Sequence, residues 1–228
     1  MIIIKRIFLF FGLVSLIFLV SCVGSSVSSN SLTEGVIEYN AEVIDQSHPM
    51  AGLAPSSATV KFKDNRVQVE MSTMGIFNTI FISDPGKKTM TQMVKFMDIK
   101  NACIETEADL VQENKNYELK LEEVTGTKKI AGYNCKRVKA TYLNNPTEFF
   151  DVYYTDELGL DSINNISPYK QLKGMLMQYR LKKLGLEMCF TATSVKKEEV
   201  KVDVFEVPAF YKIVTRCEME KLFEDIQN

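Results

Sequence analysis

The feature that most constrains the fold is a repeated alternation of apolar and polar residues with a period of two. In one run, apolar Ile37, Tyr39, Ala41 and Val43 are separated by polar residues. Side chains of a strand point alternately to its two faces, so this pattern is typical of a β-strand with one buried and one solvated face. Related runs recur over residues 60–99, 117–154, 175–193 and 200–204. The pattern predicts about ten short strands.

The segments between the runs are short and rich in turn residues. In Asp84-Pro85-Gly86-Lys87, proline presets φ and glycine accepts a positive φ. Short helices are expected over residues 104–111 and 167–174, and at the C-terminus, where Thr215-x-x-Glu218 forms a capping box. No strand–helix–strand rhythm is present. The sequence therefore predicts a mainly β (α+β) fold: a curved antiparallel sheet or half-barrel with short helices on its concave face and a C-terminal helix.

The N-terminus has the order of an export signal. Lys5 and Arg6 precede a mostly apolar run that ends at Val20, shorter than the ~20 residues of a membrane-spanning helix. The sequence Leu19-Val20-Ser21-Cys22 resembles the lipobox of bacterial lipoproteins. That resemblance implies that Cys22 is diacylated and becomes the first residue of the mature chain. The alternative is an ordinary export signal with an incidental cysteine.

These observations predict a signal peptide over residues 1–21, a lipidated Ser- and Gly-rich tether over 22–33 and a single domain over 34–228. Without Lys5 and Arg6, the chain has 25 basic and 29 acidic residues, a net charge of −4. This balance argues against a nucleic-acid partner. Attachment to a membrane would come from lipid on Cys22 rather than from a basic face. The tether lacks an acidic cluster next to Cys22, which favours the periplasmic face of the outer membrane.

Four cysteines follow Cys22, namely Cys103, Cys135, Cys189 and Cys217. In an oxidising compartment they could form two disulfides, with three possible pairings. We favour Cys103–Cys135 and Cys189–Cys217, the closest in sequence. The alternative is four buried thiols that behave as small apolar residues.

Few residues suit catalysis. His48 is the only histidine and lies in a proline-containing loop, and the chain has no G-x-S-x-G elbow, no C-x-x-C pair and no glycine-rich phosphate loop. We therefore expect no enzyme activity, no catalytic residue, no metal site and no cofactor. Two Met-x-x-Met pairs could suggest copper, but residues three apart on a strand point to opposite faces.

Methionines are the more informative residues. Ten follow Cys22, and several fall on predicted inner strand faces. Flexible, polarisable methionine suits either an adaptable apolar cavity or ordinary core filling. If a cavity exists, its expected wall consists of Met71, Met177, Tyr179, Met188 and Phe190, and the loop over residues 46–57 could gate its mouth.

Residues 127–136, with the sequence T-K-K-I-A-G-Y-N-C-K, resemble an exported bacterial family known as domain of unknown function 4412, a relative of the GLPGLI family. A second match is Phe205-Glu206-Val207-Pro208 followed by Tyr211-Lys212. The resemblance implies an architecture similar to that of lipoprotein-carrier half-barrels, in which helices plug an apolar concavity. It implies a binding or envelope-assembly role and brings no catalytic residue.

Together, these patterns predict a non-enzymatic, outer-membrane-anchored periplasmic lipoprotein. Its half-barrel cavity would bind a lipid, an acylated protein or another apolar ligand. The alternative is an envelope scaffold or protein-interaction module with no small-molecule ligand.

Overall fold

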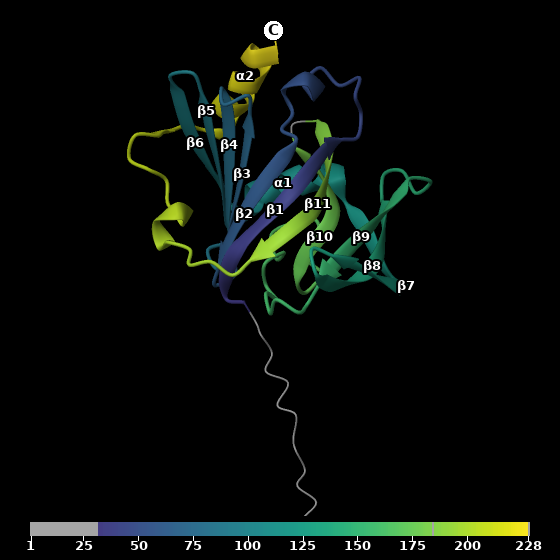
Figure 1. Cartoon of the computed structure of the whole chain (residues 1–228). Helices are drawn as coiled ribbons and strands as arrows, with labels where there is room; N and C mark the ends of the chain where they lie inside the picture. Colours follow the sequence, from purple (N-terminus) through teal and green to yellow (C-terminus); the bar gives the residue numbers. More distant parts are fainter. Residues whose placement is uncertain (1–31, 184, 228) are drawn as a thin grey trace, which may run out of the picture.

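The computed structural model describes residues 32–183 and 185–227. The predicted signal peptide, Cys22 and the tether up to residue 31 lie outside the described residues. The described chain forms one 12-stranded sheet, in which the two-residue strand β12 pairs parallel to β6 and all other pairs are antiparallel. Figure 1 shows that the sheet is strongly curved and open. The predicted fold class is confirmed.

The strand order shows two meanders joined at one seam. The strands are β1 (Glu34–Val43), β2 (Ser57–Lys63), β3 (Arg66–Thr73), β4 (Phe77–Asp84), β5 (Thr89–Phe96), β6 (Ile99–Glu105), β7 (Leu119–Ile130), β8 (Tyr133–Tyr142), β9 (Phe149–Thr155), β10 (Met175–Lys183), β11 (Leu186–Lys196) and β12 (Lys212–Ile213). Their order in the sheet is β12-β6-β5-β4-β3-β2-β1-β11-β10-β9-β8-β7. Only the β1–β11 pairing joins the meander β1–β6 to the meander β7–β11.

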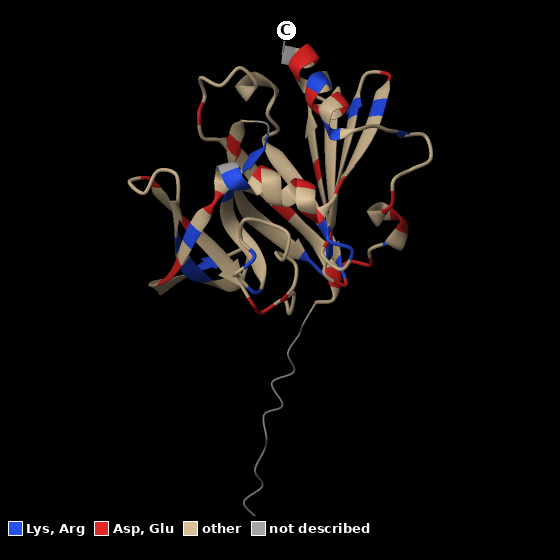
Figure 2. Cartoon of the chain, turned by 180° about the vertical axis from the view of Figure 1, so that it is seen from behind, with Lys and Arg blue, Asp and Glu red and all other residues tan. Residues whose placement is uncertain are grey.

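Two α-helices pack beside this sheet. Helix α1 (Glu107–Asn114) begins with a capping box between Thr106 and Asp109 and lies across the concave face, as Figure 2 shows. Helix α2 (Arg216–Gln227) forms the C-terminus. The Thr215 backbone N–H donates to Glu218 Oε2 at 2.7 Å, so the predicted capping box at α2 is confirmed. The described part of the chain also contains three short 3-10 helices: η1 (Ala51–Leu53), η2 (Lys115–Tyr117) and η3 (Val202–Phe205).

The alternation in β1 has the predicted physical effect. Ile37, Tyr39 and Ala41 are buried together with Val60 and Phe62 of β2, whereas the intervening residues of β1 are at least partly exposed. This burial supplies the main hydrophobic stabilisation of the central strands.

Two local predictions are wrong. Residues 200–204 form no strand, and residues 202–204 belong to η3, which packs on the outer face of β3. Val204 O accepts from Gln68 Nε2 of β3, and Val200 O, just before η3, accepts from Lys63 Nζ of β2. Residues 200–204 follow β11 in the chain, but both edges of β11 are already paired, one with β1 and one with β10. The segment therefore has no unpaired edge of β11 to join as a strand. Residues 167–174 form turns instead of a helix, because Asn164 Nδ2 donates to the carbonyls of Leu172 and Gly174.

Candidate ligand-binding cavity

A cavity of about 230 Å³ lies between the concave face of the sheet and the segments that cover it. This volume is many times the roughly 10–15 Å³ needed to hold one water. The sheet wall consists of Val69, Met71, Phe77, Thr79, Phe81, Ser83, Met90, Gln92, Tyr179, Leu181, Lys182, Lys183, Leu186, Met188 and Phe190. The covering wall consists of Met50, Leu53, Ala54, Pro55, Leu110, Glu113, Asn114, Tyr117, Ile166, Ser167, Pro168 and Phe223. Most of these side chains are apolar.

Four of the five residues predicted for the wall line this cavity: Met71, Tyr179, Met188 and Phe190. They come from three strands, β3, β10 and β11, and period-two alternation turns them to the same face. The rings of Tyr179 and Phe190 stack at 5.3 Å between centroids. The ring of Tyr39 on β1 packs edge-on against the ring of Tyr179, with 6.0 Å between the centroids, so this aromatic wall contacts the central strands of the sheet.

Met177 is the exception and does not line the cavity. Its side chain is fully buried in the main core cluster. Met188 and Phe190 belong to the same cluster and Tyr179 packs against it, so Met177 lies on the predicted face but is covered there by neighbouring core residues. Met177 therefore contributes to packing and not to the cavity wall.

The loop over residues 46–57 closes one side of the cavity. Met50, Leu53, Ala54 and Pro55 line it, and Leu53 O accepts a hydrogen bond of 2.8 Å from Thr73 Oγ1 at the end of β3. Leu53 is 38% exposed, so the cavity wall reaches the molecular surface at this loop. Phe223 of α2 covers the neighbouring part, edge-on to Phe77 at 5.9 Å.

A charged cluster of Glu105, Glu113, Lys183, Arg216 and Glu220 borders the cavity. Lys183 Nζ lies 3.1 Å from Glu105 Oε2 and 2.8 Å from Glu113 Oε2. Arg216 lies 3.8 Å from Glu105, 4.0 Å from Glu113 and 2.9 Å from Glu220. Glu105 is only 3% exposed, and desolvation raises its pKa although Lys183 acts in the opposite direction.

The charged cluster also joins distant parts of the sheet. Strand β6, which carries Glu105, and β10, which carries Lys183, are seven strand steps apart. In a flat sheet that separation would be about 34 Å. The observed contact between these two side chains is possible only because the sheet curls around its concave face.

Gln92 is a polar residue at an apolar position. It stands between Met90 and Val94 on the inner face of β5, is 4% exposed, and lines both the cavity and a small pocket beside Glu105 and Arg216. Its Nε2 atom has no hydrogen-bond partner within the described part of the chain. A buried amide without a partner costs roughly 1–3 kcal/mol. Our sequence reasoning missed Gln92, although a glutamine in a run of inward apolar residues is a visible signal.

Three tyrosine hydroxyls donate hydrogen bonds near the segments that cover the cavity. Tyr117 of η2 and Tyr142 of β8 both donate to Glu187 Oε1. Tyr169 donates to the Arg180 carbonyl. Burial raises the pKa of Tyr142 to about 12, so this hydroxyl stays protonated at neutral pH and can act as a donor.

The four described cysteines are free thiols, and the predicted disulfides are absent among them. Cys103 on β6 and Cys135 on β8 are separated by eight intervening strands. The two thiols are buried in different core clusters, Cys103 with Met219 and Phe223 and Cys135 with Ile37 and Phe62, so this pairing does not form. Cys189 is half-buried on β11, whereas Cys217 is exposed on α2. Burial raises the pKa of Cys103, Cys135 and Cys189.

His48 forms a hydrogen bond within its own loop, in which its Nδ1 accepts from the Met50 backbone N–H at 3.1 Å. Within residues 32–183 and 185–227, no group of three or more His, Cys, Asp or Glu side chains is arranged to hold a metal ion. In the same part of the chain, no helix has the length and apolar character needed to cross a bilayer.

Comparison with known proteins gives distant structural similarities only. No protein-family model matches the chain, and no curated protein matches its sequence. The chain is similar to PNGF-II in a P21 crystal form, with a TM-score of 0.48 and 13% identity over 83% of this chain and 33% of that chain. It is also similar to the Mycobacterium tuberculosis lipoprotein LppX, with a TM-score of 0.38 and 13% identity over 75% of this chain and 90% of that chain.

A third similarity is to the MucA/MucB complex of Pseudomonas aeruginosa, with a TM-score of 0.35 and 12% identity over 82% of this chain and 60% of that chain. The chain spans about a third of the length of PNGF-II. All three TM-scores lie below 0.5, so none of these proteins informs what this chain binds. The resemblance of residues 127–136 to an exported family stays a prediction.

Proposed function

We propose that this chain is a non-enzymatic, lipid-anchored protein of the bacterial envelope that binds one apolar ligand in the cavity described above. A lipid, or one acyl chain of an acylated protein, is the ligand class that fits. The observation that carries the proposal is the apolar cavity of about 230 Å³ between the sheet and α1. Protein interiors are normally close-packed, with few voids larger than one water. Burial of an acyl chain there would yield roughly 25 cal/mol per Å² of apolar surface.

The composition of the wall supports an adaptable site. Met50, Met71, Met90 and Met188 all contribute to it. Their unbranched side chains can change rotamer to follow the shape of a flexible chain. The volume lies just below the roughly 300–1,000 Å³ of typical ligand pockets, which favours one chain over a multiply acylated lipid.

The charged groups of the wall support binding rather than catalysis. Of the three charged residues that line the cavity, Glu113 and Lys183 pair with each other at 2.8 Å, and Lys182 is exposed to solvent. None of them is therefore a free acid or base facing the apolar space. They act as a polar border to the cavity.

The proposed location follows from the N-terminal sequence. The lipobox-like residues ending at Cys22 support acylation, and the tether lacks an acidic cluster, which favours the periplasmic face of the outer membrane.

The direct test is uptake of diphenylhexatriene, a dye that fluoresces in apolar surroundings, by the chain from residue 22 with Cys22→Ser. All described strands, helices and core clusters lie within residues 32–227, so this chain retains the whole fold. We expect saturable binding of one dye per chain. Met71→Trp should fill the cavity and weaken binding by about tenfold or more, whereas Ser72→Trp on the outer face of the same strand should leave it unchanged.

A folded wild-type chain that takes up no dye would refute the proposal. Equal binding by the two tryptophan variants would show that the dye binds elsewhere. Circular dichroism of each variant checks that the sheet is intact.

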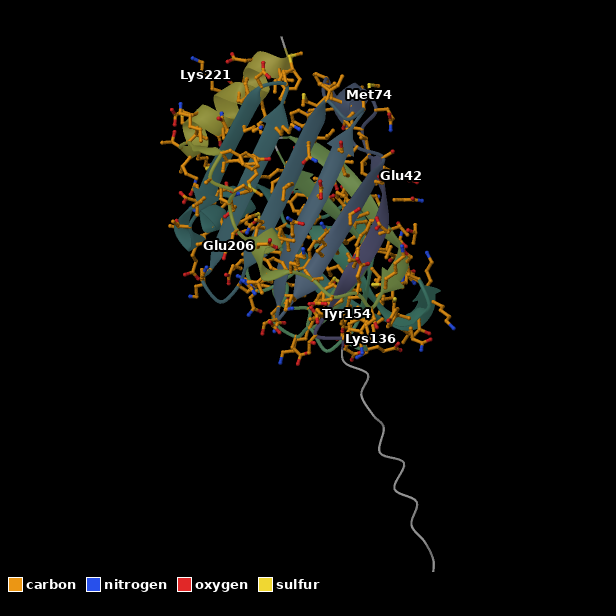
Figure 3. All side chains as sticks on the ribbon, turned by 60° about the vertical axis from the view of Figure 1, so that its left-hand side comes forward. Glu42, Met74, Lys136, Tyr154, Glu206 and Lys221 are labelled. Atoms are coloured by element: carbon orange, nitrogen blue, oxygen red, sulfur yellow. The ribbon has the colours of Figure 1, made fainter. Side chains whose placement is uncertain are left out.

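A second candidate function is docking to an apolar partner in the envelope. The turns at one end of the sheet expose Met74 (84%), Ile76 (54%) and Met97 (68%). Figure 3 shows Met74 at the end opposite Lys136 and Tyr154. Met74→Glu with Met97→Glu should abolish such docking and leave dye uptake unchanged. Loss of dye uptake would instead assign these residues to ligand binding.

A further inference from the structure

We propose that the ligand is a neutral acyl ester and that the side-chain amide of Gln92 binds its carbonyl oxygen. This inference rests on the proposed function and deepens it, because it names the chemical class of ligand and the residue that recognises the head group.

The position of Gln92 suits recognition of a head group. Its side chain lines the large apolar cavity and also the small pocket beside Glu105, Lys183 and Arg216, so it lies where the apolar and polar regions meet. An amphiphile whose chain fills the cavity would have its head group at this junction. Gln92 is therefore placed to meet the first polar atoms after the chain.

The side-chain amide of Gln92 offers a hydrogen-bond donor to a ligand. Gln92 is 4% exposed, and its Nε2 atom has no partner within residues 32–183 and 185–227. Buried amide groups are ordinarily hydrogen-bonded. A ligand that supplies an acceptor to this Nε2 gains a hydrogen bond and removes an unpaired buried group, whereas a plain hydrocarbon does neither.

The charge of the cluster beside Gln92 selects a neutral acceptor. Lys183 already lies within 3.1 Å of two carboxylates, and Arg216 lies within 4.0 Å of three. Three acidic and two basic groups leave this cluster with one excess negative charge when Glu105 is ionised. A fatty-acid carboxylate would be repelled there, whereas an ester carbonyl accepts a hydrogen bond without adding charge.

The test measures competition with diphenylhexatriene on the chain from residue 22 with Cys22→Ser. Three competitors share one chain length: 1-lauroylglycerol, its ether analogue 1-O-dodecylglycerol, which lacks the carbonyl, and laurate. Wild-type protein should bind the ester about tenfold more tightly than either of the others, as expected for one buried hydrogen bond.

Gln92→Leu should remove the preference for the ester over the ether, with the affinities of both competitors expressed relative to the affinity of the same variant for the dye. Gln68→Leu is the matched control. Gln68 is a similarly buried glutamine on β3, but it donates to Val204 O on the outer face and does not line the cavity. This control should keep the preference for the ester.

The outcomes separate the two proposals. Dye binding with equal affinities for ester and ether in wild-type protein would overturn the role of Gln92 and leave the cavity proposal standing. Tighter binding of laurate than of the ester would overturn the charge argument and with it the ligand class. Absence of dye binding would overturn both proposals. The wild-type comparison decides even if Gln92→Leu fails to fold.

Discussion

The charged cluster at the cavity border should be a main determinant of stability, and Lys183→Met tests this directly. Lys183 lies 2.8 Å from Glu113 and 3.1 Å from Glu105, and Glu105 is 3% exposed. Removal of one partner from a buried ion pair costs about 3–5 kcal/mol, because the remaining charge stays buried without compensation. The side chains of Lys183 and Glu113 are 20% and 23% exposed, and Arg216 remains 3.8 Å from Glu105. We therefore expect a loss of about 2–3 kcal/mol near neutral pH.

The pH dependence gives this prediction a second, independent readout. Desolvation raises the pKa of Glu105 in the folded protein above its pKa in the unfolded protein. At pH values between these two pKa values, the folded state therefore binds more protons than the unfolded state. The contribution of Glu105 to stability therefore decreases as pH rises through that window. Loss of Lys183, which lowers this pKa, should raise it further. The cost of Lys183→Met should accordingly be smaller at about pH 5 than at about pH 8.

Urea unfolding followed by circular dichroism measures both effects. Lys136→Met is the control, because the Lys136–Asp156 pair is 52% and 49% exposed and such pairs contribute at most about 1 kcal/mol. The double variant Lys183→Met/Glu105→Gln should regain part of the lost stability, since it no longer buries an unpaired charge. The reasoning is refuted if Lys183→Met costs no more than Lys136→Met, or if its cost does not change with pH.

Three further predictions concern packing, backbone and thiols. Met177→Ala should lower the free energy of unfolding in urea by about 2–5 kcal/mol, because Met177 is fully buried in the core. Met71→Ala should lower it less, because Met71 borders an existing cavity, and equal losses for the two variants would contradict these placements. Gly174→Ala should lower the melting temperature strongly, since φ at Gly174 is +134° and a Cβ there would lie 2.3 Å from Thr155 O. The control Gly126→Ala should cost only backbone strain, since φ is +121° but no atom lies within 4 Å of the added Cβ, and similar shifts in melting temperature for the two variants would refute the close approach at Gly174. In the Cys22→Ser chain, a thiol reagent should modify Cys217 rapidly and all four cysteines after unfolding without reductant; fewer than four reactive thiols would indicate a disulfide.

The elements that sequence alone could predict are those set by local patterns. The alternation of apolar and polar residues predicted β1 and the hairpin strands. It also placed Met71, Tyr179, Met188 and Phe190 on one face, because the period of two holds along each regular strand. The α2 capping box was equally local, since Thr215 and Glu218 satisfy each other across one turn.

The features that sequence could not predict depend on irregularity or on contacts between distant strands. The register shift near Met177 follows from pairing between β9 and β10, which no local pattern encodes. The helix expected over residues 104–111 begins only at Glu107, because Ile104 belongs to β6, and α1 buries Leu110 while Val111 is exposed. The contact between Glu105 and Lys183 required the curvature of the whole sheet.

The cysteines illustrate the same limit. Proximity in sequence suggested the pairing of Cys103 with Cys135, but the two lie on strands of different meanders. Sequence separation carries little information about distance in a sheet whose N-terminal strand pairs with β11. The strand order and the curvature of the sheet together decide which cysteines can meet.

The central claim is that the cavity holds an acyl chain, and the most direct measurement is organic extraction followed by mass spectrometry. The chain from residue 22 with Cys22→Ser would be purified from a bacterial periplasm beside its Met71→Trp and Ser72→Trp variants. The account predicts about one acyl lipid per chain in the parent and in Ser72→Trp, and little in Met71→Trp. Folded parent protein that carries no lipid and also refuses diphenylhexatriene would contradict it.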